Sequence, residues 1–463
     1  MSTVSPVDVV VVRPAARLRG DLVLPGDKSI SHRALMLATL ADGASRITSA
    51  GDGADIRSTA AVCRALGASV ERLEGDRAEG RPPTTVDYRV VSPGVNGLRQ
   101  PAADLDCGNS GTSLRLFAGI VAGLPFRSVL DGDDSLRRRP VARIIEPLRS
   151  MGATLLGRSD DSLPPLTVIG RYPLRSVDYA TPVPSAQVKS AILLAGLRAE
   201  GPTTVRETVA TRDHTERMLR ARGVTVRTDR VDGHGAEATA TGVAVTIEGG
   251  GVMEAIDQRV PGDVSAAAFW LVAGSIHPDA DLTLRGVGLN PTRRAVIDLL
   301  RSMGADIEER PAADEPVGTG VGEPIGDLRV RSSALRSIDF DPDAVAAAID
   351  EIPVLCLAAA LARGVTTIRG AGELRYKESD RIAGTVAGLR ALGVEVSVSG
   401  DDIRISGGAR LRGSTTDSID DHRLAMTFAV AGLLATGETT VLRPASAAIS
   451  YPGFFDDLGR VAS

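Results

Sequence analysis

Four predicted helix starts carry side chains suited to hold anions. They are Lys28-Ser29, Asn109-Ser110-Gly111-Thr112, Ser185-Ala186-Gln187 and Asp421-His422-Arg423. The first turn of a helix offers free N–H groups and the positive end of the helix dipole, so several such starts brought together would bind an oxyanion strongly. A single Ser or Asn at such a position is more often a simple helix cap. The binding interpretation therefore depends on the cations that accompany these starts.

Cations that could serve such a site are spread along the whole chain. They are Lys28, Arg33, Arg115, Arg139, Lys189, Arg212, Lys377, Arg381 and Arg423. Any one of them alone is most simply a solvated surface charge. Ser29 and Arg33 are one helical turn apart, and so are Lys377 and Arg381 if one helix covers both, so each pair would face one ligand. Together the cations predict a site for acidic small molecules.

The elements that must position these residues repeat six times. The segments begin near Gly26, Gly108, Ser185, Gly262, Asp350 and Asp421, which makes a unit of about 80 residues. A second helix in five units ends at a glycine suited to the left-handed conformation of a C-cap, namely Gly67, Gly152, Gly223, Gly304 and Gly393. Each unit reads strand, helix, strand, helix, strand, with hairpin turns expected at 229–242 and 318–327. This pattern predicts an α/β protein with three units in each of two domains.

Composition excludes several classes of protein. The 463 residues require two or three domains, and 24% charged with 43% hydrophobic residues is typical of a folded chain. A formal net charge of −5 argues against a nucleic-acid-binding protein. Cys63, Cys107 and Cys356 have no C-x-x-C spacing, which favours buried thiols in a reducing compartment. We find neither a secretory signal nor a membrane-length apolar run, so we expect a cytoplasmic location.

Familiar catalytic motifs do not fit. The segment at 26–29 lacks the glycine spacing of a P-loop, and no G-x-S-x-G elbow is present. The histidines show no metal-ligand spacing; they are His32, His214, His234, His277 and His422. We therefore expect neither a metal nor another cofactor.

Seven motifs resemble those of the 5-enolpyruvylshikimate-3-phosphate synthase family, in the same order, over residues 15 to 457. They are P-G-D-K-S-I-S-H-R (25–33), G-N-S-G-T-S-L-R (108–115), G-D-D-S-L-R-R-R-P (132–140), S-A-Q-V-K-S-A (185–191), T-R-D-H-T-E (211–216), L-R-Y-K-E-S-D-R (374–381) and D-D-H-R-L-A-M (420–426). The resemblance implies the enolpyruvyl transferase fold, in which two similar domains of three βαβαββ-like units enclose an active site in the cleft between them. The domains would be residues 25–260 and residues 1–24 with 261–463.

The resemblance also implies a reaction and its residues. Phosphoenolpyruvate would give its enolpyruvyl group to the 5-hydroxyl of shikimate 3-phosphate and release phosphate, a step toward aromatic amino acids. Shikimate 3-phosphate would be held by Lys28, Ser29, Arg33, Ser185, Gln187, Arg212, Asp350 and Lys377. Phosphoenolpyruvate would be held by Lys28, Gly111, Arg139, Gln187, Arg381 and Arg423. Glu378 matches the proton donor, Asp350 matches the residue at the attacking hydroxyl, and Lys28 would share the proton transfers; the sequence leaves open which group carries which proton.

Three positions carry further expectations. Ile449 stands where many members have a lysine, and Glu373 where some have an asparagine that touches the shikimate ring, so both contacts would differ here. Gly111 is the position at which a methyl group reduces glyphosate binding in some relatives, so we expect a glyphosate-sensitive enzyme.

Two alternatives remain at this point. The sister transferase that acts on UDP-N-acetylglucosamine has a G-A-K-N start and a reactive cysteine where this chain has Asp134. A non-catalytic anion-binding protein could keep the fold, but this chain retains the acid, the base and most of the cations. We expect a monomer that binds small molecules and neither nucleic acid nor membrane.

Overall fold

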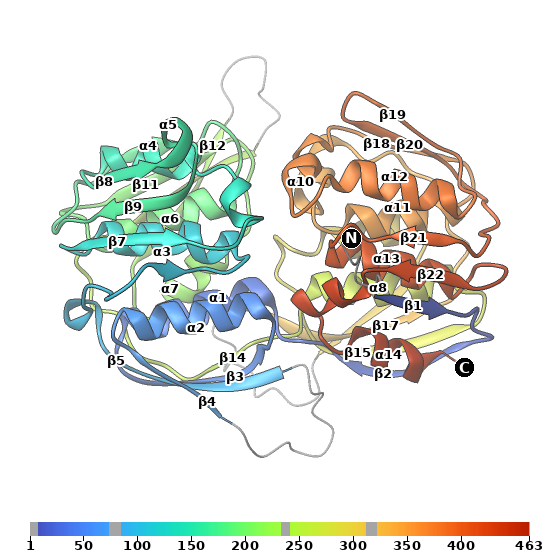
Figure 1. The fold of residues 1–463 in the computed structure, drawn as a ribbon, viewed down its shortest axis with the longest axis horizontal. Coiled ribbons are helices and arrows are strands. Elements are labelled where there is room, and N and C mark those ends of the chain that lie inside the picture. The colour runs from blue at the N-terminus through green and yellow to red at the C-terminus, as the bar shows by residue number, and fades with distance from the viewer. Residues whose placement is uncertain (1–7, 74–84, 233–240, 312–321, 463) are drawn as a thin grey trace, which may run out of the picture.

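The computed structural model describes residues 8–73, 85–232, 241–311 and 322–462. These residues pack around two separate hydrophobic cores, which define two lobes lying side by side (Figure 1). The core of the N-terminal lobe is built from side chains between Ile30 and Val260. The core of the C-terminal lobe combines residues 12–24 with residues 264–461. The start of the chain therefore packs with its end.

The N-terminal lobe contains three units. Its elements are α1 (Lys28–Leu40), β3 (Asp42–Gly51), α2 (Ala54–Ala65), β4 (Ser69–Leu73), β5 (Thr85–Pro93), η1 (Val95–Gly97), β6 (Leu105–Asp106), α3 (Gly111–Ala122), β7 (Arg127–Asp131), η2 (Leu136–Arg138), α4 (Ala142–Ser150), β8 (Thr154–Gly157), α5 (Arg158–Asp161), β9 (Leu163–Ile169), β10 (Asp178–Ala180), α6 (Ala186–Gly196), β11 (Thr203–Glu207), α7 (His214–Arg220), β12 (Val226–Asp232), β13 (Thr241–Ile247) and β14 (Gln258–Arg259).

The C-terminal lobe repeats the plan. Its elements are β1 (Val9–Val12), β2 (Leu18–Val23), α8 (Val264–Ile276), β15 (Ala280–Gly288), α9 (Ala295–Ser302), β16 (Asp306–Pro311), β17 (Ile325–Arg331), α10 (Pro342–Ala347), α11 (Ile352–Leu361), β18 (Val365–Ile368), η4 (Gly372–Tyr376), α12 (Arg381–Ala391), β19 (Val396–Ser399), β20 (Asp402–Ser406), β21 (Thr415–Asp417), α13 (His422–Gly432), β22 (Thr439–Leu442), η5 (Pro444–Ile449) and α14 (Phe454–Val461).

Strand order confirms the predicted repeat. The four-stranded sheets run β14-β3-β5-β4, β6-β7-β9-β8, β10-β11-β13-β12 and β2-β15-β17-β16, and the three-stranded sheets run β18-β20-β19 and β1-β22-β21. Each four-stranded sheet opens with a parallel pair and continues with antiparallel pairs. The last unit differs, because the chain leaves β22 for η5 and α14 and the N-terminal strand β1 pairs with β22 instead. The two expected hairpins form as β12–β13 and β16–β17, while their turns at 233–240 and 312–321 lie outside the described residues.

The first helix of each unit lies in the middle of its lobe. Helices α1, α3 and α6 pack in one lobe and α8, α11 and α13 in the other. Helix α8 is buried from Val264 to Ser275 and α11 from Ile352 to Ala360. A helix that is apolar on all sides is stable only inside a core. This burial fixes where the N-terminal ends of the helices point.

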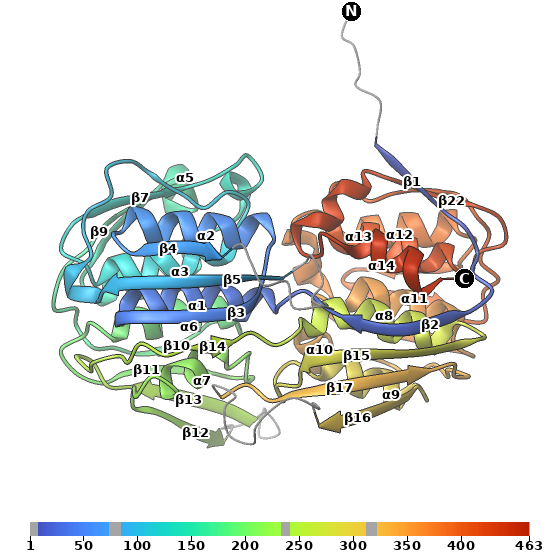
Figure 2. The same cartoon turned by 90° about the horizontal axis from the view of Figure 1, so that it is seen from below.

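The chain crosses between the lobes twice, at residues 25–27 and 261–263, and both segments read Pro-Gly-Asp. In each segment the Asp N–H donates to the proline carbonyl of the other, over 2.7 and 2.9 Å. Strand β2, just before the first segment, pairs with β15 in the C-terminal lobe, and β14, just before the second, pairs with β3 in the N-terminal lobe (Figure 2). A Cβ at Gly26 would lie 2.0 Å from the Ser49 carbonyl, so only glycine fits there.

The second helix of five units ends in the same way. The predicted C-cap glycines all have positive φ: Gly67 114°, Gly152 100°, Gly223 81°, Gly304 98° and Gly393 89°. An arginine in the last turn donates to a strand carbonyl six residues later, namely Arg64 to Val70, Arg149 to Leu155, Arg220 to Val226, Arg301 to Ile307 and Arg390 to Val396. The repeated phrase R-x-x-G therefore joins each helix to its strand.

A substitution at Gly393 tests whether these C-cap glycines are needed for their left-handed backbone conformation. The Cβ of Gly393→Ala would meet only the Arg410 carbonyl at 4.0 Å, so its effect comes from the left-handed backbone alone. We expect the free energy of unfolding to fall by about 1 to 2 kcal/mol, measured by urea denaturation. The control is Gly459→Ala in α14, where nothing lies within 4 Å, and which should stabilise the chain by roughly 0.5 to 1 kcal/mol. Equal effects at both positions would contradict the argument.

Candidate active site

The N-terminal ends of the central helices meet at the boundary between the lobes. The side chains that cap α1, α3, α6, α8 and α13 are Asp27, Ser110, Ser185, Asp263 and Asp421. The four helix starts predicted from sequence are therefore present. Each capping group satisfies backbone N–H donors and leaves the remaining first-turn groups and nearby side chains to face the boundary.

Asp350, which lies just before α11, is surrounded by three cations. Its Oδ1 is 3.3 Å from Lys377 Nζ and 3.4 Å from Arg381 Nη1. Its Oδ2 accepts a hydrogen bond from Arg212 of the N-terminal lobe over 2.5 Å. Burial opposes ionisation of the Asp350 carboxyl, but the charges of Lys377 and Arg212 outweigh it and hold its pKa well below the usual range. Asp350 is therefore an ionised link between the lobes.

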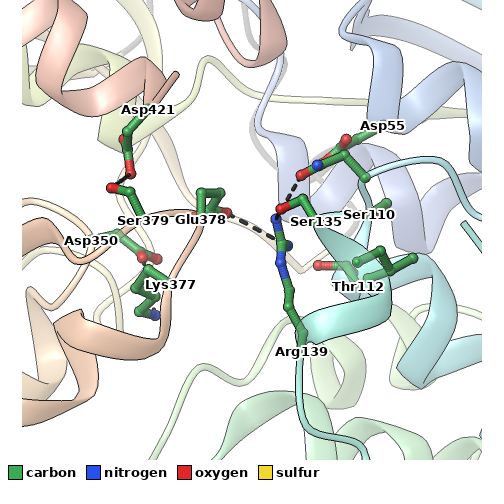
Figure 3. A network of polar contacts seen from close by, with 12 residues as sticks. Asp55, Ser110, Thr112, Ser135, Arg139, Asp350, Lys377, Glu378, Ser379 and Asp421 are labelled. Carbon is green, nitrogen blue, oxygen red and sulfur yellow. Dashed lines mark hydrogen bonds and ion pairs between the residues drawn. The ribbon is translucent and has the colours of Figure 1, made fainter. Parts of the chain in front are cut away.

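Glu378 lies between cations of both lobes. Arg381, only 1% exposed, donates to Glu378 Oε2 over 2.5 Å and to Asp421 over 2.8 Å. Arg139 reaches across from the N-terminal lobe, with Nη1 3.9 Å from Glu378 Oε1 (Figure 3). Burial raises the pKa of the Glu378 carboxyl, but Arg381 and its neighbours more than offset this and keep the pKa well below its usual range.

Two arginines flank Gly111 at the start of α3. Arg139 donates to Asn109 Oδ1 over 2.6 Å, and Arg115 donates to Gln187 Oε1 over 2.8 Å. A Cβ at Gly111 would lie 2.7 Å from Arg115 Nη1 and 3.5 Å from Arg139 Nη1. Burial lowers the pKa of Arg115 to about 10, so it remains a cation at neutral pH. Gly111 thus leaves room between two positive charges and a helix N-terminus.

Lys28 is the first residue of α1 and contacts two carboxylates. Its Nζ forms an ion pair with Asp55, and its backbone N–H donates to Asp263 Oδ2 over 3.2 Å. Sequence reasoning missed Asp55, because no motif or spacing singles it out. The Asp55 carboxylate holds the Lys28 side chain at the boundary between the lobes.

Arg33 lies one turn after Ser29 on α1, as predicted. Its Nη1 donates to the Ser29 carbonyl over 3.0 Å, its Nε to Thr215 over 2.7 Å and its Nη2 to Ser190 over 2.9 Å. All three partners are neutral. Burial lowers the pKa of Arg33 to about 10, which still leaves it charged. An arginine held in this way keeps a positive charge that an anion can balance.

Arg423, in the first turn of α13, approaches a second carboxylate. Its Nη1 is 3.8 Å from Glu351 Oε1, and Glu351 also accepts from Arg293 over 3.3 Å and from Ser265. Arg293 and Glu351 are 4% and 2% exposed. Sequence reasoning did not assign either residue, although Glu351 stands next to Asp350.

Gln187 and Ser185 lie at the start of α6, as expected. Gln187 donates to Thr112 over 3.0 Å and accepts from Arg115, so it connects the starts of α6 and α3. Ser185 accepts from the Val188 N–H over 3.5 Å. Its hydroxyl hydrogen can still be donated to a ligand.

Two predictions about cations are wrong. Lys377 and Arg381 do not share a helix, because α12 begins at Arg381 and Lys377 has extended backbone; they meet at Asp350 instead. Lys189 is not a cation available to a ligand. It is 1% exposed and paired with Glu207 and Glu216.

The structure also places the two departures from the family pattern. Glu373 contacts Arg143 of the other lobe at 3.1 Å, with both side chains about half exposed. The Ile449 carbonyl lies 2.4 Å from the position of a Cβ at Gly53, so η5 packs against the start of α2. Ile449 adds no charge to the site.

Several other groups bear on the chemistry. Cys63, Cys107 and Cys356 are free and buried, as predicted, and burial raises the pKa of Cys63 and Cys356 to about 12. In the described part of the chain, no three His, Cys, Asp or Glu side chains are grouped to hold a metal ion. None of the helices described has both the length and the apolar character of a membrane span.

The fold and the site define a class of enzyme in which two similar α/β lobes enclose small acidic substrates. The family described as EPSP synthase (3-phosphoshikimate 1-carboxyvinyltransferase) matches residues 12–458, and the chain belongs to this family.

Individual relatives agree along nearly the whole chain. Proteins named 3-phosphoshikimate 1-carboxyvinyltransferase from Gloeobacter violaceus and Halorhodospira halophila are each 49% identical; the matches cover 97% of this chain and 98% and 95% of those proteins. The structure of EPSP synthase from Acinetobacter baumannii superposes with a TM-score of 0.82 at 39% identity, over 98% of both chains.

His422 predicts a pH-dependent stability. Burial lowers its pKa to about 3 from 6.5, so the unfolded chain takes up a proton below pH 6.5 while the folded chain does not. Stability from this group is complete above pH 6.5 and declines as the pH falls toward 3, by roughly 2 kcal/mol at pH 5. Urea unfolding across this range should show a shallower decline in His422→Gln. An identical decline in both proteins would rule out the assignment.

Proposed function

We propose that this chain transfers the enolpyruvyl group of phosphoenolpyruvate to the 5-hydroxyl of shikimate 3-phosphate and releases phosphate. One observation carries the proposal: in the described part of the chain, the buried guanidinium group of Arg33 and the partly buried one of Arg115 have no carboxylate at ion-pair distance. Each substrate carries a phosphate and a carboxylate, about six negative charges together, which would balance these cations.

The substrates divide between the two ends of the site. Shikimate 3-phosphate is held by Lys28, Ser29, Arg33, Ser185, Gln187, Arg212, Asp350 and Lys377. Phosphoenolpyruvate is held by Lys28, Gly111, Arg139, Gln187, Arg381 and Arg423. Gln187 lies in the first turn of α6, which is capped by Ser185 of the first group, and it bonds to Thr112, which follows Gly111 of the second group; these contacts support its place between the two groups. Arginines suit the phosphoenolpyruvate end because their paired N–H donors match carboxylate and phosphate oxygens.

The reaction needs an acid and a base in reach of the substrates. A proton is added to the methylene carbon, the 5-hydroxyl oxygen bonds to the neighbouring carbon and loses its proton, and the tetrahedral adduct then loses phosphate and the added proton. Glu378 supplies the proton at the methylene carbon, Asp350 orients and deprotonates the hydroxyl, and Lys28 shares in the transfers. The position of Asp350 between Arg212 and Lys377, two residues of the shikimate 3-phosphate group, supports its role.

The lobes correspond to two domains, residues 25–260 and residues 1–24 with 261–463. The two separate hydrophobic cores and the paired Pro-Gly-Asp segments support this division. The enzyme works as a monomer in the cytoplasm. The supply of every proposed site residue by one chain and the three free thiols support this assignment.

The sister reaction with UDP-N-acetylglucosamine is the main competitor. Its reactive cysteine is replaced here by Asp134, whose side chain is 89% exposed. None of the three cysteines can substitute, because all are buried and burial raises the pKa of each thiol.

A phosphate-release assay tests the proposed reaction. Phosphate should appear from phosphoenolpyruvate with shikimate 3-phosphate, without added metal, and not with UDP-N-acetylglucosamine. Glu378→Gln keeps the size of the side chain but removes the acid, so kcat should fall at least about 100-fold while both KM values stay within about threefold.

Glu373→Gln is the matched control, since Glu373 lies five positions away and, among the residues described, forms an ion pair only with the exposed Arg143. Its kcat should equal that of the wild type. Turnover with UDP-N-acetylglucosamine instead of shikimate 3-phosphate would contradict the proposed reaction. An active Glu378→Gln enzyme would contradict the role proposed for Glu378.

Gly111→Ala tests the phosphoenolpyruvate end. The added methyl group would lie 2.7 Å from Arg115 Nη1, so it should raise KM for phosphoenolpyruvate. It should raise the inhibition constant of glyphosate by a larger factor than it raises this KM. KM for shikimate 3-phosphate serves as the internal control and should change by less than about threefold. Unchanged glyphosate inhibition would show that Gly111 does not line this part of the site.

A further inference from the structure

Lys189 lies at the centre of a buried ion cluster next to the site. Its Nζ is 2.8 Å from Glu207 Oε2 and 2.9 Å from Glu216 Oε1, and these three side chains are at most 1% exposed. Burial opposes the charge on Lys189, but Glu216 and Glu207 outweigh it and raise its pKa. The ammonium group is therefore charged, but it is too deeply buried for a substrate to contact it.

One side of the cluster holds the backbone beside Arg212. Lys189 Nζ donates to the Thr211 carbonyl over 3.2 Å. Glu207 accepts from the Thr211 hydroxyl over 2.6 Å and from its N–H over 3.3 Å. Thr211 immediately precedes Arg212, whose guanidinium reaches Asp350. The cluster thus fixes the backbone position from which the Arg212 side chain extends.

The other side of the cluster holds Arg33. Ser190 follows Lys189 on α6, and Thr215 precedes Glu216 on α7. Their hydroxyls are 2.7 Å apart, and both accept from Arg33, at 2.9 and 2.7 Å. The distance between α6 and α7 therefore determines whether both acceptors can reach one guanidinium.

We propose that Lys189 is a positioning residue for the shikimate 3-phosphate end of the site, which rests on the function proposed above. Without its charge, two buried carboxylates, Glu207 at the end of β11 and Glu216 on α7, would repel each other beside α6. Thr211 and Thr215 would move apart, and Arg212 and Arg33 with them. The arginines at the other end, Arg139 and Arg381, have no contact with this cluster among the residues described, so the effect is specific to one substrate.

Steady-state kinetics with both substrates tests this role. Lys189→Met keeps an unbranched side chain and removes the charge. We expect KM for shikimate 3-phosphate to rise at least about tenfold, while KM for phosphoenolpyruvate stays within about threefold. Equal changes in both KM values, or no change in either, would overturn the proposal.

Arg222→Met is the matched control for loss of a buried cation. Arg222 is fully buried and donates to Gln258 and to the Met218 carbonyl, outside the proposed binding residues. It should lower the thermal unfolding temperature without raising KM for shikimate 3-phosphate. A rise equal to that of Lys189→Met would assign the effect to general destabilisation and overturn the proposal.

Thr211→Val decides the question if Lys189→Met does not fold. It leaves the ion cluster intact and removes only the hydroxyl bonded to Glu207, so KM for shikimate 3-phosphate should rise about fivefold, the equivalent of one neutral hydrogen bond. An unchanged KM would overturn the proposal. The wild-type assay separates the two claims: a wild type without turnover rejects the proposed function, whereas an active wild type with unaffected variants rejects only the role of Lys189.

Discussion

Around Arg381 at the lobe boundary, carboxylates alternate with cations, and this pairing stabilises the charges buried there. Arg381 is almost fully buried and contacts Asp350, Glu378 and Asp421, while Asp350 in turn contacts cations of both lobes. Taking a single charge out of water costs several kcal/mol, and a partner at hydrogen-bond distance offsets most of this cost. The groups around Asp350 and Arg381 therefore form one connected set of charges that spans both lobes, and the fold must bring both signs of charge to the same place.

The repeated unit places both the cations and the carboxylates at the lobe boundary. In each unit the first helix is buried in the middle of its lobe, so the side chains that it contributes to the boundary come from its N-terminal end. Lys28, Gly111 and Arg423 occupy the first turns of α1, α3 and α13, and Asp350 lies just before α11. Two Pro-Gly-Asp crossings, bonded to each other, hold the two sets of helix ends face to face.

Local features could be predicted from sequence and long-range partners could not. Glycines such as Gly393 and the caps Ser110 and Ser185 follow from rules that span a few residues. The bond between Arg212 and Asp350 joins positions 138 apart, and no local pattern encodes it. The family motifs predict which cations bind the substrates, but they do not show that Lys189 is already paired with Glu207 and Glu216. A free and a paired lysine look alike until the fold brings their partners together.

The same cations that would bind the substrates also control the acid and the base. Arg139 and Arg381 keep Glu378 ionised, and an ionised carboxyl cannot donate a proton. A bound phosphate and carboxylate would cancel part of this positive charge and raise the pKa of Glu378, because a nearby anion favours the protonated form. Glu378 would then become a useful acid only with phosphoenolpyruvate in place. This coupling would explain how the proposed proton donor can lie among arginines: their charge keeps the carboxylate ionised until the substrate that needs the proton is bound.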